Sequence, residues 1–404
     1  MHKVGKMSDP KAQARPVAEA PPLKILVAIQ YYLPHRTGVP IHVQRVAEAL
    51  VQRGHTVTIL TARHSMDLPR DEVINGVRLV RLWAPLRVSR GMVMPAYPWA
   101  AWGLIRTHDV VWLHTPMLET SLLALLASMA GKRVVGTHHG DLILPPGPFN
   151  RFVQWFTFQH YRFFAKRAAR LIAYSHDYAD HSYYLKPFRD KVSVIYPPIQ
   201  VPDPQPERVA ELRARWQLDG GPIIGYAGRF VREKRPDLLI RALEVVNRHY
   251  PTARVVFAGE YDIRYEDTWE RAQPLIQRYD DQLIFLGKLE SMQAMANFYA
   301  ACDVLVLPSD TECFALVQVE AMLCGTPVVM TDTPGGRVPV QVTGMGKIVP
   351  RGDWEAMGAA VVEILQQPQR FIKPREQIEQ QFNFQETVDR YEKHLRRAAR
   401  MPKR

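Results

Sequence analysis

Residues 308–322 read Pro-Ser-Asp-Thr-Glu-Cys-Phe-Ala-Leu-Val-Gln-Val-Glu-Ala-Met and come directly after a strand-like run at residues 303–307. This order predicts a buried strand, a polar turn and a helix, which is one step of a parallel α/β sheet. Glu312 falls in the turn and Glu320 falls in the helix, eight positions later. Because eight helical residues span about two turns, we expect both carboxylates to point along one side of a ligand.

Between the two glutamates, the first N–H groups of the helix are suited to an anion such as a diphosphate. We assign this role to Phe314, Ala315 and Leu316. One carboxylate near a sugar, a second near a ribose and phosphate between them is the geometry of a nucleotide-sugar site. The segment therefore predicts binding of a nucleotide diphosphate sugar.

Strand-like and helix-like stretches alternate along the chain, which is typical of parallel sheets covered by helices. Predicted strands of the first half are 24–29, 56–60, 77–82, 109–113, 133–137, 171–174 and 192–195. Those of the second half are 222–226, 254–257, 283–285, 304–307 and 327–330. The pattern predicts an α/β fold of two doubly wound, Rossmann-like domains that face each other across a cleft.

Five prolines between residues 197 and 206 interrupt this alternation and mark the domain boundary. We expect four segments: a disordered extension at 1–22, domains at 23–198 and 199–380, and a C-terminal segment at 381–404. That last segment contains a basic amphipathic helix, which we expect to pack back on the N-terminal domain. A further helix is predicted from Ile41 to Arg53.

Composition limits the class of protein. A chain of 404 residues is long for one core, and its 47% hydrophobic and 23% charged residues are ordinary for a soluble protein. Its three cysteines have no metal-ligand spacing and favour a reducing cytoplasm. No apolar run is long enough to span a bilayer. The net charge of +12 suits an anionic partner.

The turn at residues 228–236 follows the first strand of the second half. Ligands of doubly wound sheets bind beyond the carboxyl ends of strands, so Arg229 and Lys234 are candidates to clamp a diphosphate. The alternative is a solvated charged turn, which is common in such loops. The presence of Glu312 and Glu320 in the same half favours the diphosphate.

The first half offers two weaker candidates. Gly38, in the matching turn at residues 31–38, lets the backbone approach a phosphate, although a single glycine often marks only a turn. His139 follows a predicted strand and is placed to bond a phosphate or sugar oxygen. Its neighbours His138 and Asp141 raise the question of a metal, but no further ligand has metal spacing, so we predict none.

These residues resemble those of retaining glycosyltransferases of family 4, which have the GT-B fold, over roughly residues 24–395. The resemblance rests on a Glu, seven residues, a second Glu, and then Ala-Met-x-x-Gly-x-Pro-Val-Val. In this chain those positions are Glu312, Glu320, Ala321, Met322, Gly325, Pro327, Val328 and Val329. Further matches are the Gly228-Arg229-Phe230 turn with Lys234, and Pro34, Gly38 and residues 53–57 in the first half.

The resemblance implies a role for each candidate. Glu320 would bond the ribose, Glu312 would hold hydroxyls of the donor sugar, and His139 would help at the sugar or phosphate. Arg229 and Lys234 would bind the diphosphate and stabilise it as leaving group. The N-terminal domain would bind the acceptor and the C-terminal domain the nucleotide sugar.

The implied activity is hexosyl transfer, with retention, from a nucleotide diphosphate sugar to an acceptor hydroxyl. The acceptor would be lipid-linked or a saccharide, in glycolipid or cell-surface polysaccharide synthesis. No cofactor and no metal is expected, because two cations already face the diphosphate. Two departures bear on the site: Thr37-Gly38 stands where the family often has paired glycines, and Cys313 where it often has Gly or Ala.

Two other functions stay open. A nucleotide-sugar epimerase shares this fold, and a non-catalytic sugar-nucleotide binding protein would keep the pocket alone. The presence of both Glu312 and Lys234 disfavours the second. Nucleic-acid binding rests only on charge and has no base-stacking motif, so we predict no nucleic-acid partner.

Residues 149–170 predict a helix with an unusual second face. Helical spacing places an apolar side toward the core, comprising Phe149, Phe152, Val153, Phe156, Phe163 and Phe164. The other side holds Trp155 and Phe158 among Arg151, Arg162 and Lys166. Such a mixture suits an anionic membrane surface, and it predicts a cytoplasmic protein that docks on the inner face of the membrane. A second aromatic-rich segment, 92–102, is a candidate for the acceptor entrance. Alternatively, the two aromatics pack under a loop and the basic residues keep the helix soluble.

Overall fold

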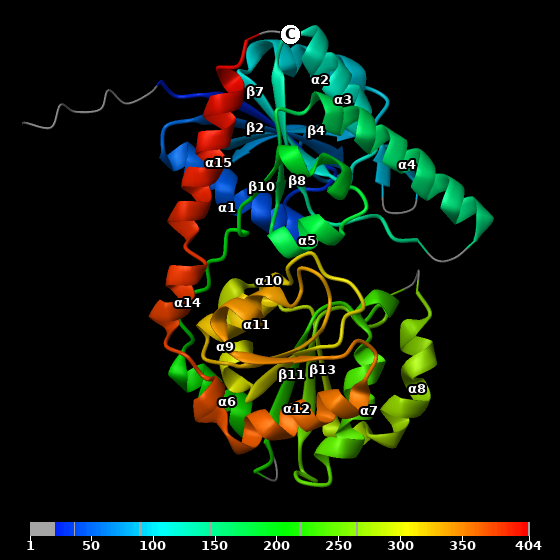
Figure 1. Cartoon of the computed structure of the whole chain (residues 1–404), viewed down its shortest axis with the longest axis vertical. Helices are drawn as coiled ribbons and strands as arrows, with labels where there is room; N and C mark the ends of the chain where they lie inside the picture. Colours follow the sequence, from blue (N-terminus) through cyan, green and yellow to red (C-terminus); the bar gives the residue numbers. More distant parts are fainter. Residues whose placement is uncertain are drawn as a thin grey trace, which may run out of the picture.

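The computed structural model describes residues 21–35, 37–88, 91–144, 147–217, 220–263 and 266–402. The expected N-terminal extension lies almost wholly outside these residues. The described chain forms two α/β domains, stacked along the long axis of the molecule (Figure 1), each built on one largely parallel sheet. The predicted α/β fold with two Rossmann-like domains is confirmed.

The N-terminal sheet has the strand order β10-β9-β8-β7-β1-β2-β4-β3. Its strands are β1 (Lys24–Ala28), β2 (Thr56–Arg63), β3 (Asp71–Ile74), β4 (Val77–Trp83), β7 (Val110–Thr115), β8 (Arg133–His138), β9 (Arg170–Ala173) and β10 (Val192–Val194). β7 is buried at every position, as expected of a central parallel strand covered on both faces. The strand order reverses between β1 and β7, which are hydrogen-bonded neighbours.

The sequence prediction missed three strands of this domain. β3 pairs antiparallel with β4 through Asn75 and Gly76, which both have positive φ. An Asn-Gly pair of this kind is the strongest short hairpin signal in a sequence. A separate hairpin joins β5 (Leu86–Val88) and β6 (Gly91–Val93).

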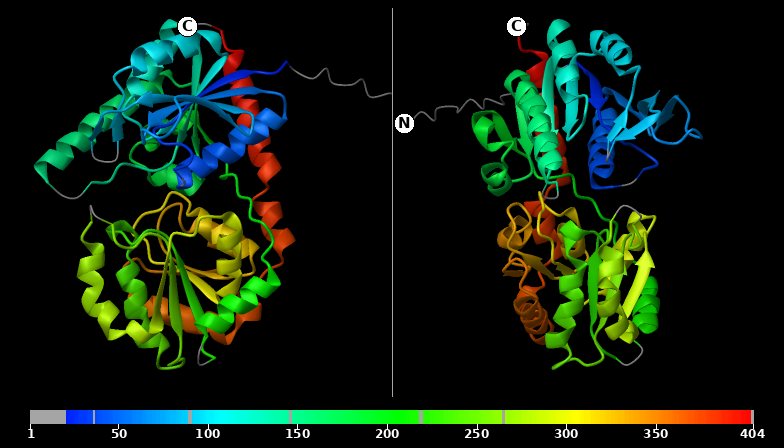
Figure 2. Two further views of the ribbon diagram at one scale, coloured as in Figure 1. Left: turned by 180° about the vertical axis from the view of Figure 1, so that it is seen from behind. Right: turned by 90° about the vertical axis from the view of Figure 1, so that its right-hand side faces the viewer.

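Helices cover both faces of the N-terminal sheet (Figures 1 and 2). They are α1 (Gly38–Gln52), α2 (Tyr97–Thr107), α3 (Thr120–Met129), α4 (Pro148–Arg167), α5 (His176–His181) and the 3₁₀ segment η1 (Lys186–Lys191). The C-terminal helix α15 (Phe384–Ala399) lies beside α1, shown in red in Figure 1. Val388, Tyr391 and Leu395 of α15 are fully buried in the N-terminal core.

The C-terminal sheet has the order β13-β12-β11-β14-β15-β16 and is parallel throughout. Its strands are β11 (Ile223–Ala227), β12 (Arg254–Ala258), β13 (Leu283–Gly287), β14 (Val304–Leu307), β15 (Val328–Thr331) and β16 (Gly346–Val349). Only β16 was not predicted. The strand order reverses between β11 and β14.

The C-terminal sheet is likewise covered on both faces. Its helices are α6 (Pro206–Trp216), α7 (Pro236–Val246), α8 (Thr268–Arg278), α9 (Met292–Ala301), α10 (Leu316–Leu323), α11 (Val338–Thr343), α12 (Trp354–Gln366), α13 (Pro368–Phe371) and α14 (Arg375–Gln381). Two 3₁₀ turns, η2 (Arg232–Lys234) and η3 (Asp280–Gln282), complete the domain.

The carboxyl ends of the two sheets meet at the domain boundary. Tyr174, which follows β9, contacts the ring of Phe314, which lies between β14 and α10. The chain crosses between domains in the proline-containing segment 195–205 and returns between α14 and α15. The loops that follow the strands of one sheet therefore face those of the other.

The predicted core face of α4 is wrong at its N-terminal end. Phe164 is fully buried and its ring lies over Gly136, where a Cβ would stand 2.4 Å from that ring. Phe149, Phe152 and Phe156, assigned to the same side, are 74%, 59% and 50% exposed. Helical spacing defined the stripe, but the first half of α4 extends past the body of the domain (Figure 1), where no other described element covers it.

Candidate active site

Glu312 and Lys234 meet where the strand order of the C-terminal sheet reverses. Lys234 ends η2 after β11, and Glu312 lies in the loop between β14 and α10. The Lys234 ammonium donates a hydrogen bond to Glu312 Oε1, and the Ser309 hydroxyl donates to the same oxygen at 2.9 Å. The carboxyl ends at such a reversal are the usual ligand position in doubly wound sheets. The fold thus brings two of the predicted residues together from positions far apart in the sequence.

The loop after β11 carries both predicted cations. Burial alone would lower the pKa of the Lys234 ammonium, but the Glu312 carboxylate outweighs this effect and holds that pKa above its ordinary value. The guanidinium of Arg229 lies 3.8 Å from the Glu233 carboxylate. The Tyr226 hydroxyl donates to the Arg229 carbonyl at 2.8 Å and fixes the turn. Lys234 therefore remains charged beside Glu312.

The start of α10 has an unusual backbone. Ala315, the N-cap residue, has φ 56° and ψ 75°, a left-handed conformation that costs an L-residue about 1 kcal/mol. No side chain caps the helix, so its first N–H groups are available to an anion. The Phe314 side chain is fully buried against Tyr174 and Tyr196, so only its backbone can contribute to binding.

The second glutamate, Glu320, lies apart from this turn. Helix α10 begins at Leu316, so Glu312 belongs to the preceding loop and the expected spacing of two helical turns is wrong. The Tyr299 hydroxyl donates to Glu320 Oε2 at 3.0 Å, and Arg45 of α1 lies 3.4 Å from Oε1. Glu320 is therefore a buried link between the two domains as well as a candidate ribose ligand.

His139 belongs to a buried aromatic cluster at the end of β8. Its Nε2 shares a hydrogen bond of 2.8 Å with Nδ1 of His114, and its Nδ1 shares one with the Tyr174 hydroxyl. The same hydroxyl is 3.1 Å from His42 Nδ1. Burial lowers the pKa of all three histidines, that of His42 to about 3. His139 is therefore a neutral hydrogen-bonding group rather than a cation for phosphate.

Gly38 is the first residue of α1. No described atom lies within 4 Å of the position that its Cβ would take, so no neighbour in the described part of the chain requires a glycine there. Its N-cap, Thr37, makes no side-chain hydrogen bond to the helix. Helix α1 therefore presents an uncapped N-terminus at the domain boundary, which suits an anion.

A polar contact ties Glu312 to the N-terminal domain. Asp177 of α5 accepts hydrogen bonds from the Gly335 N–H at 2.8 Å and from Arg337 Nε and Nη2 at 2.9 and 2.6 Å. Gly335 forms a parallel bridge with Glu312, and a Cβ on Gly336 would stand 2.9 Å from that of Glu312. Burial alone would raise the pKa of Asp177, but Arg337 holds it below its usual value.

Both halves of the chain match family models. Residues 36–201 match Glycosyltransferase Family 4, and residues 209–383 match Glycosyl transferases group 1. The chain belongs to glycosyltransferase family 4. Its two domains are those of the GT-B fold, and the predicted family and fold are confirmed.

Two relatives and two solved structures illustrate the likeness of this glycosyltransferase. D-inositol 3-phosphate glycosyltransferase from Segniliparus rotundus is 26% identical over 360 residues, covering 82% of this chain and 78% of that protein. A GDP-mannose-dependent monoacylated α-(1-6)-phosphatidylinositol monomannoside mannosyltransferase from Corynebacterium glutamicum is 32% identical over 38% of this chain and 40% of its own.

The structural likeness extends over nearly the whole chain. Sucrose-phosphate synthase from Thermosynechococcus elongatus superposes with a TM-score of 0.73 at 20% identity, covering 93% of this chain and 98% of that one. HepE from Anabaena, solved with UDP, gives 0.73 at 18% identity and covers 93% and 100%. At these identities the likeness establishes the fold alone.

Several residues around the candidate site carry no motif that predicts them. Asp177 lies in a six-residue helix that carries no motif, and Arg45 is one of many basic residues. The paired glycines before Arg337 are a usable signal for a tight loop, since Gly-Gly marks turns. His114 lies in the buried strand β7 and Tyr174 directly follows β9, and both bond His139. A polar side chain among apolar ones is informative at such positions.

The described residues also bear on metals and membranes. Among them, no three His, Cys, Asp or Glu side chains gather as a group able to hold a metal ion. No helix in the described part of the chain is long and apolar enough to cross a membrane.

Proposed function

We propose that this glycosyltransferase moves a hexose from a nucleotide diphosphate sugar to an acceptor hydroxyl, with retention at the anomeric carbon. The observation that carries the proposal is the Lys234–Glu312 pair at the strand reversal, next to the uncapped start of α10. Support comes from HepE, which was solved with UDP and with UDP-glucose, and from the GDP-mannose-dependent relative.

The reaction breaks the bond between the anomeric carbon and a diphosphate oxygen. Negative charge grows on the diphosphate, and Lys234, Arg229 and the N–H groups of α10 stabilise it. One such preorganised donor contributes about 2.7–4 kcal/mol to lowering the barrier. Glu312 holds the sugar hydroxyls and Glu320 the ribose. The acceptor oxygen attacks from the face that the diphosphate leaves, and its proton passes to the departing diphosphate oxygen as the new C–O bond forms.

The acceptor is lipid-linked or a saccharide, used in glycolipid or cell-surface polysaccharide synthesis. This proposal draws on the mannosyltransferase relative, whose name gives an acylated phosphatidylinositol mannoside, whereas the name of the other relative gives an inositol phosphate, which is neither a lipid nor a saccharide. His139 has both ring nitrogens bonded, to His114 and to the Tyr174 hydroxyl, so a hydrogen bond from its neutral ring to the sugar would replace one of these two contacts. Gly38 and α1 would face the donor phosphates from the N-terminal side. The reaction takes place in the cytoplasm.

Catalysis proceeds without a divalent metal or another cofactor, because Lys234 and Arg229 supply the positive charge that the leaving group needs. Unchanged turnover in EDTA is expected. Activity that disappears with EDTA and returns with Mg²⁺ or Mn²⁺ would contradict this part of the proposal.

The decisive experiment screens the purified protein against UDP-, GDP- and ADP-sugars, measuring nucleotide release and the anomer formed. Glu312→Ala and Lys234→Ala are expected to lower the rate of release by a factor of about 100 or more while thermal unfolding remains cooperative. Wild-type rates in both variants would overturn the assigned roles. An inverted product would overturn retention, and isomerisation of the donor sugar without acceptor would identify an epimerase.

A further inference from the structure

The first half of α4 carries an uncovered aromatic surface. Phe149, Phe152, Trp155 and Phe156 are 74%, 59%, 57% and 50% exposed. The ring of Phe152 lies 6.1 Å from that of Trp155 and 6.2 Å from that of Phe156, so the rings form one patch. Soluble proteins rarely expose contiguous apolar patches of this kind unless another surface covers them.

The charges around this patch have one sign. Helix α4 contains Arg151, Arg162, Lys166 and Arg167 and no acidic residue along its 20 positions. Arg151, Trp155, Arg162 and Lys166 recur at helical spacing on one stripe, beside the stripe of exposed phenylalanines. We call the exposed phenylalanines, Trp155, Arg151 and Arg162 the α4 face.

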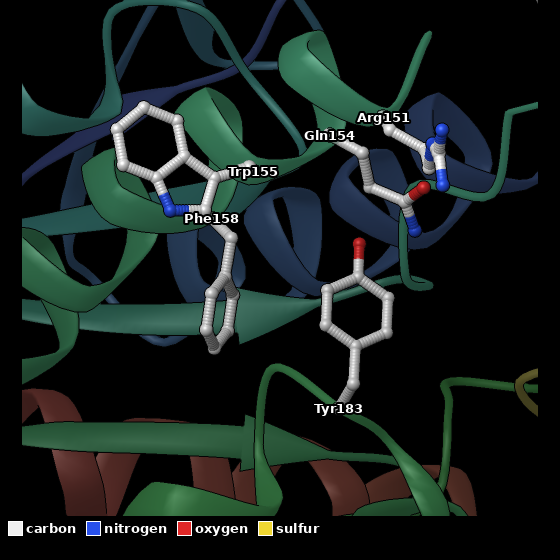
Figure 3. Close-up of a pocket in the computed structure, with 5 residues that line it drawn as sticks. All are labelled: Arg151, Gln154, Trp155, Phe158 and Tyr183. Atoms are coloured by element: carbon white, nitrogen blue, oxygen red, sulfur yellow. The ribbon is translucent and has the colours of Figure 1, made fainter. Parts of the chain in front are cut away.

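A hollow at the edge of this face combines both characters. It has a volume of about 240 Å³ and is lined by Arg151, Gln154, Trp155, Phe158 and Tyr183. In Figure 3, Trp155 and Phe158 form one wall, while Arg151 and Gln154 lie opposite, above the Tyr183 hydroxyl. That hydroxyl donates to the Leu142 carbonyl at 2.8 Å, which fixes the ring. Such a hollow offers N–H donors to a phosphate and aromatic carbon to the chains attached to it.

We propose that the α4 face docks this protein on an anionic phospholipid membrane, with a lipid phosphate at Arg151 and the aromatic rings among the acyl chains. Aromatic and basic side chains without acidic ones are the composition of interfacial helices. A second copy of the chain is a poorer occupant, because a two-fold contact would place the same basic residues opposite each other. The overall charge of +12 acts in the same direction.

The position of α4 fits a membrane-bound acceptor. Residues 140–147 connect the end of β8, where His139 lies, to the first turn of α4. Both ribbon views place that end of α4 at the level of the domain boundary (Figures 1 and 2). A membrane on the α4 face would therefore lie beside the N-terminal side of the candidate site. This last point rests on the proposed function, whereas docking itself does not.

Sedimentation with vesicles tests docking without any sugar. The full chain is mixed with phosphatidylcholine vesicles that contain or lack phosphatidylglycerol. Binding only to the anionic vesicles is expected, and high salt should weaken it. The Phe152→Ala/Trp155→Ala double variant should lower the partition coefficient at least tenfold, since it removes two large apolar rings that the membrane would bury. Arg151→Glu should lower it more than fivefold, because each basic residue contributes about fivefold.

Two control variants match these changes. Trp83→Ala removes a tryptophan that is 52% exposed at the far side of the N-terminal sheet. Arg215→Glu reverses an exposed charge on α6 of the other domain. Both should bind like the wild type.

Equal binding to both vesicle types, or unchanged binding in the α4 variants, would overturn the proposal. If the wild type forms a dimer and does not bind vesicles, and if the double variant is a monomer, the α4 face is instead a contact between two copies of the chain. Nucleotide release in vesicle-free solution should stay unchanged in every variant, which separates docking from the proposed function.

Discussion

The loop around Glu312 and the first half of α4 are built in opposite ways. Glu312 is held by Lys234, by Ser309 and by a bridge to Gly335, and Asp177 reaches it through that glycine from the other domain. The α4 face has large apolar side chains in solvent and no carboxylate on its helix. A site that must stabilise developing charge is preorganised by the protein itself, whereas a surface that docks elsewhere leaves its contacts to the partner.

Substitutions within α4 give the largest expected contrast. Phe164→Ala empties the space over Gly136 and should lower the free energy of unfolding by about 3–5 kcal/mol. Phe152→Ala, on the same helix but exposed, should change it by less than about 0.5 kcal/mol. Denaturant unfolding of both variants measures the difference. Equal losses would mean that the first half of α4 is covered in solution.

Lys234→Ala should come next. It removes a cation next to the leaving group, so kcat/KM should fall by a factor of about 100 to 1,000. Lys347→Ala is the matched control, because Lys347 pairs with Glu363 in the same domain, on β16 and α12, away from the strand reversal. That control should keep its kcat/KM. A similar loss in both variants would show that the effect comes from general destabilisation.

Asp177→Asn tests whether the two domains hold Glu312 together. The amide keeps the shape of the side chain but loses a charged pairing with Arg337, an effect of about 1–3 kcal/mol. We expect about a tenfold or greater fall in kcat, with a smaller change in the KM for donor. Arg337→Ala should match it, and the double variant should lose little more. If the losses in kcat of the two single variants instead add up in the double variant, Asp177 and Arg337 do not act on Glu312 as one unit.

The smallest expected effect concerns Glu392 on α15, which lies outside both the loop around Glu312 and α4. Burial alone would raise the pKa of Glu392 on α15, but Arg396 and Arg53 lower it to about 2. A depressed folded-state pKa adds stability that is complete above the ordinary value and is lost as pH falls toward 2. Because Glu392 and its two arginine partners are partly exposed to solvent, Glu392→Gln should lower the free energy of unfolding by only about 1 kcal/mol at neutral pH. Thermal unfolding at neutral pH and near pH 2 should show the difference between variant and wild type shrink in acid.

Local patterns in the sequence predicted most of the strands and the candidate residues at their ends. Lys234 and Glu312 could be placed beyond β11 and β14 because both follow short apolar runs, and parallel strands bring their carboxyl ends to one edge. Asn75-Gly76 is an equally local hairpin signal, so β3 could also be predicted from the sequence. The backbone at the start of α10 could not be predicted, because no sequence pattern indicates that an alanine adopts a positive φ.

The sequence by itself determined the two βα series, the family and the residues offered at the strand reversals, since these depend on periodicity and short motifs. Only the tertiary structure decided that Asp177 reaches Gly335, 158 positions away, that His139 is neutral among buried rings, and that half of the apolar stripe of α4 is in solvent. Such features depend on which distant element lies against a residue. No local pattern encodes that, because the same helical stripe forms whether or not another element covers it.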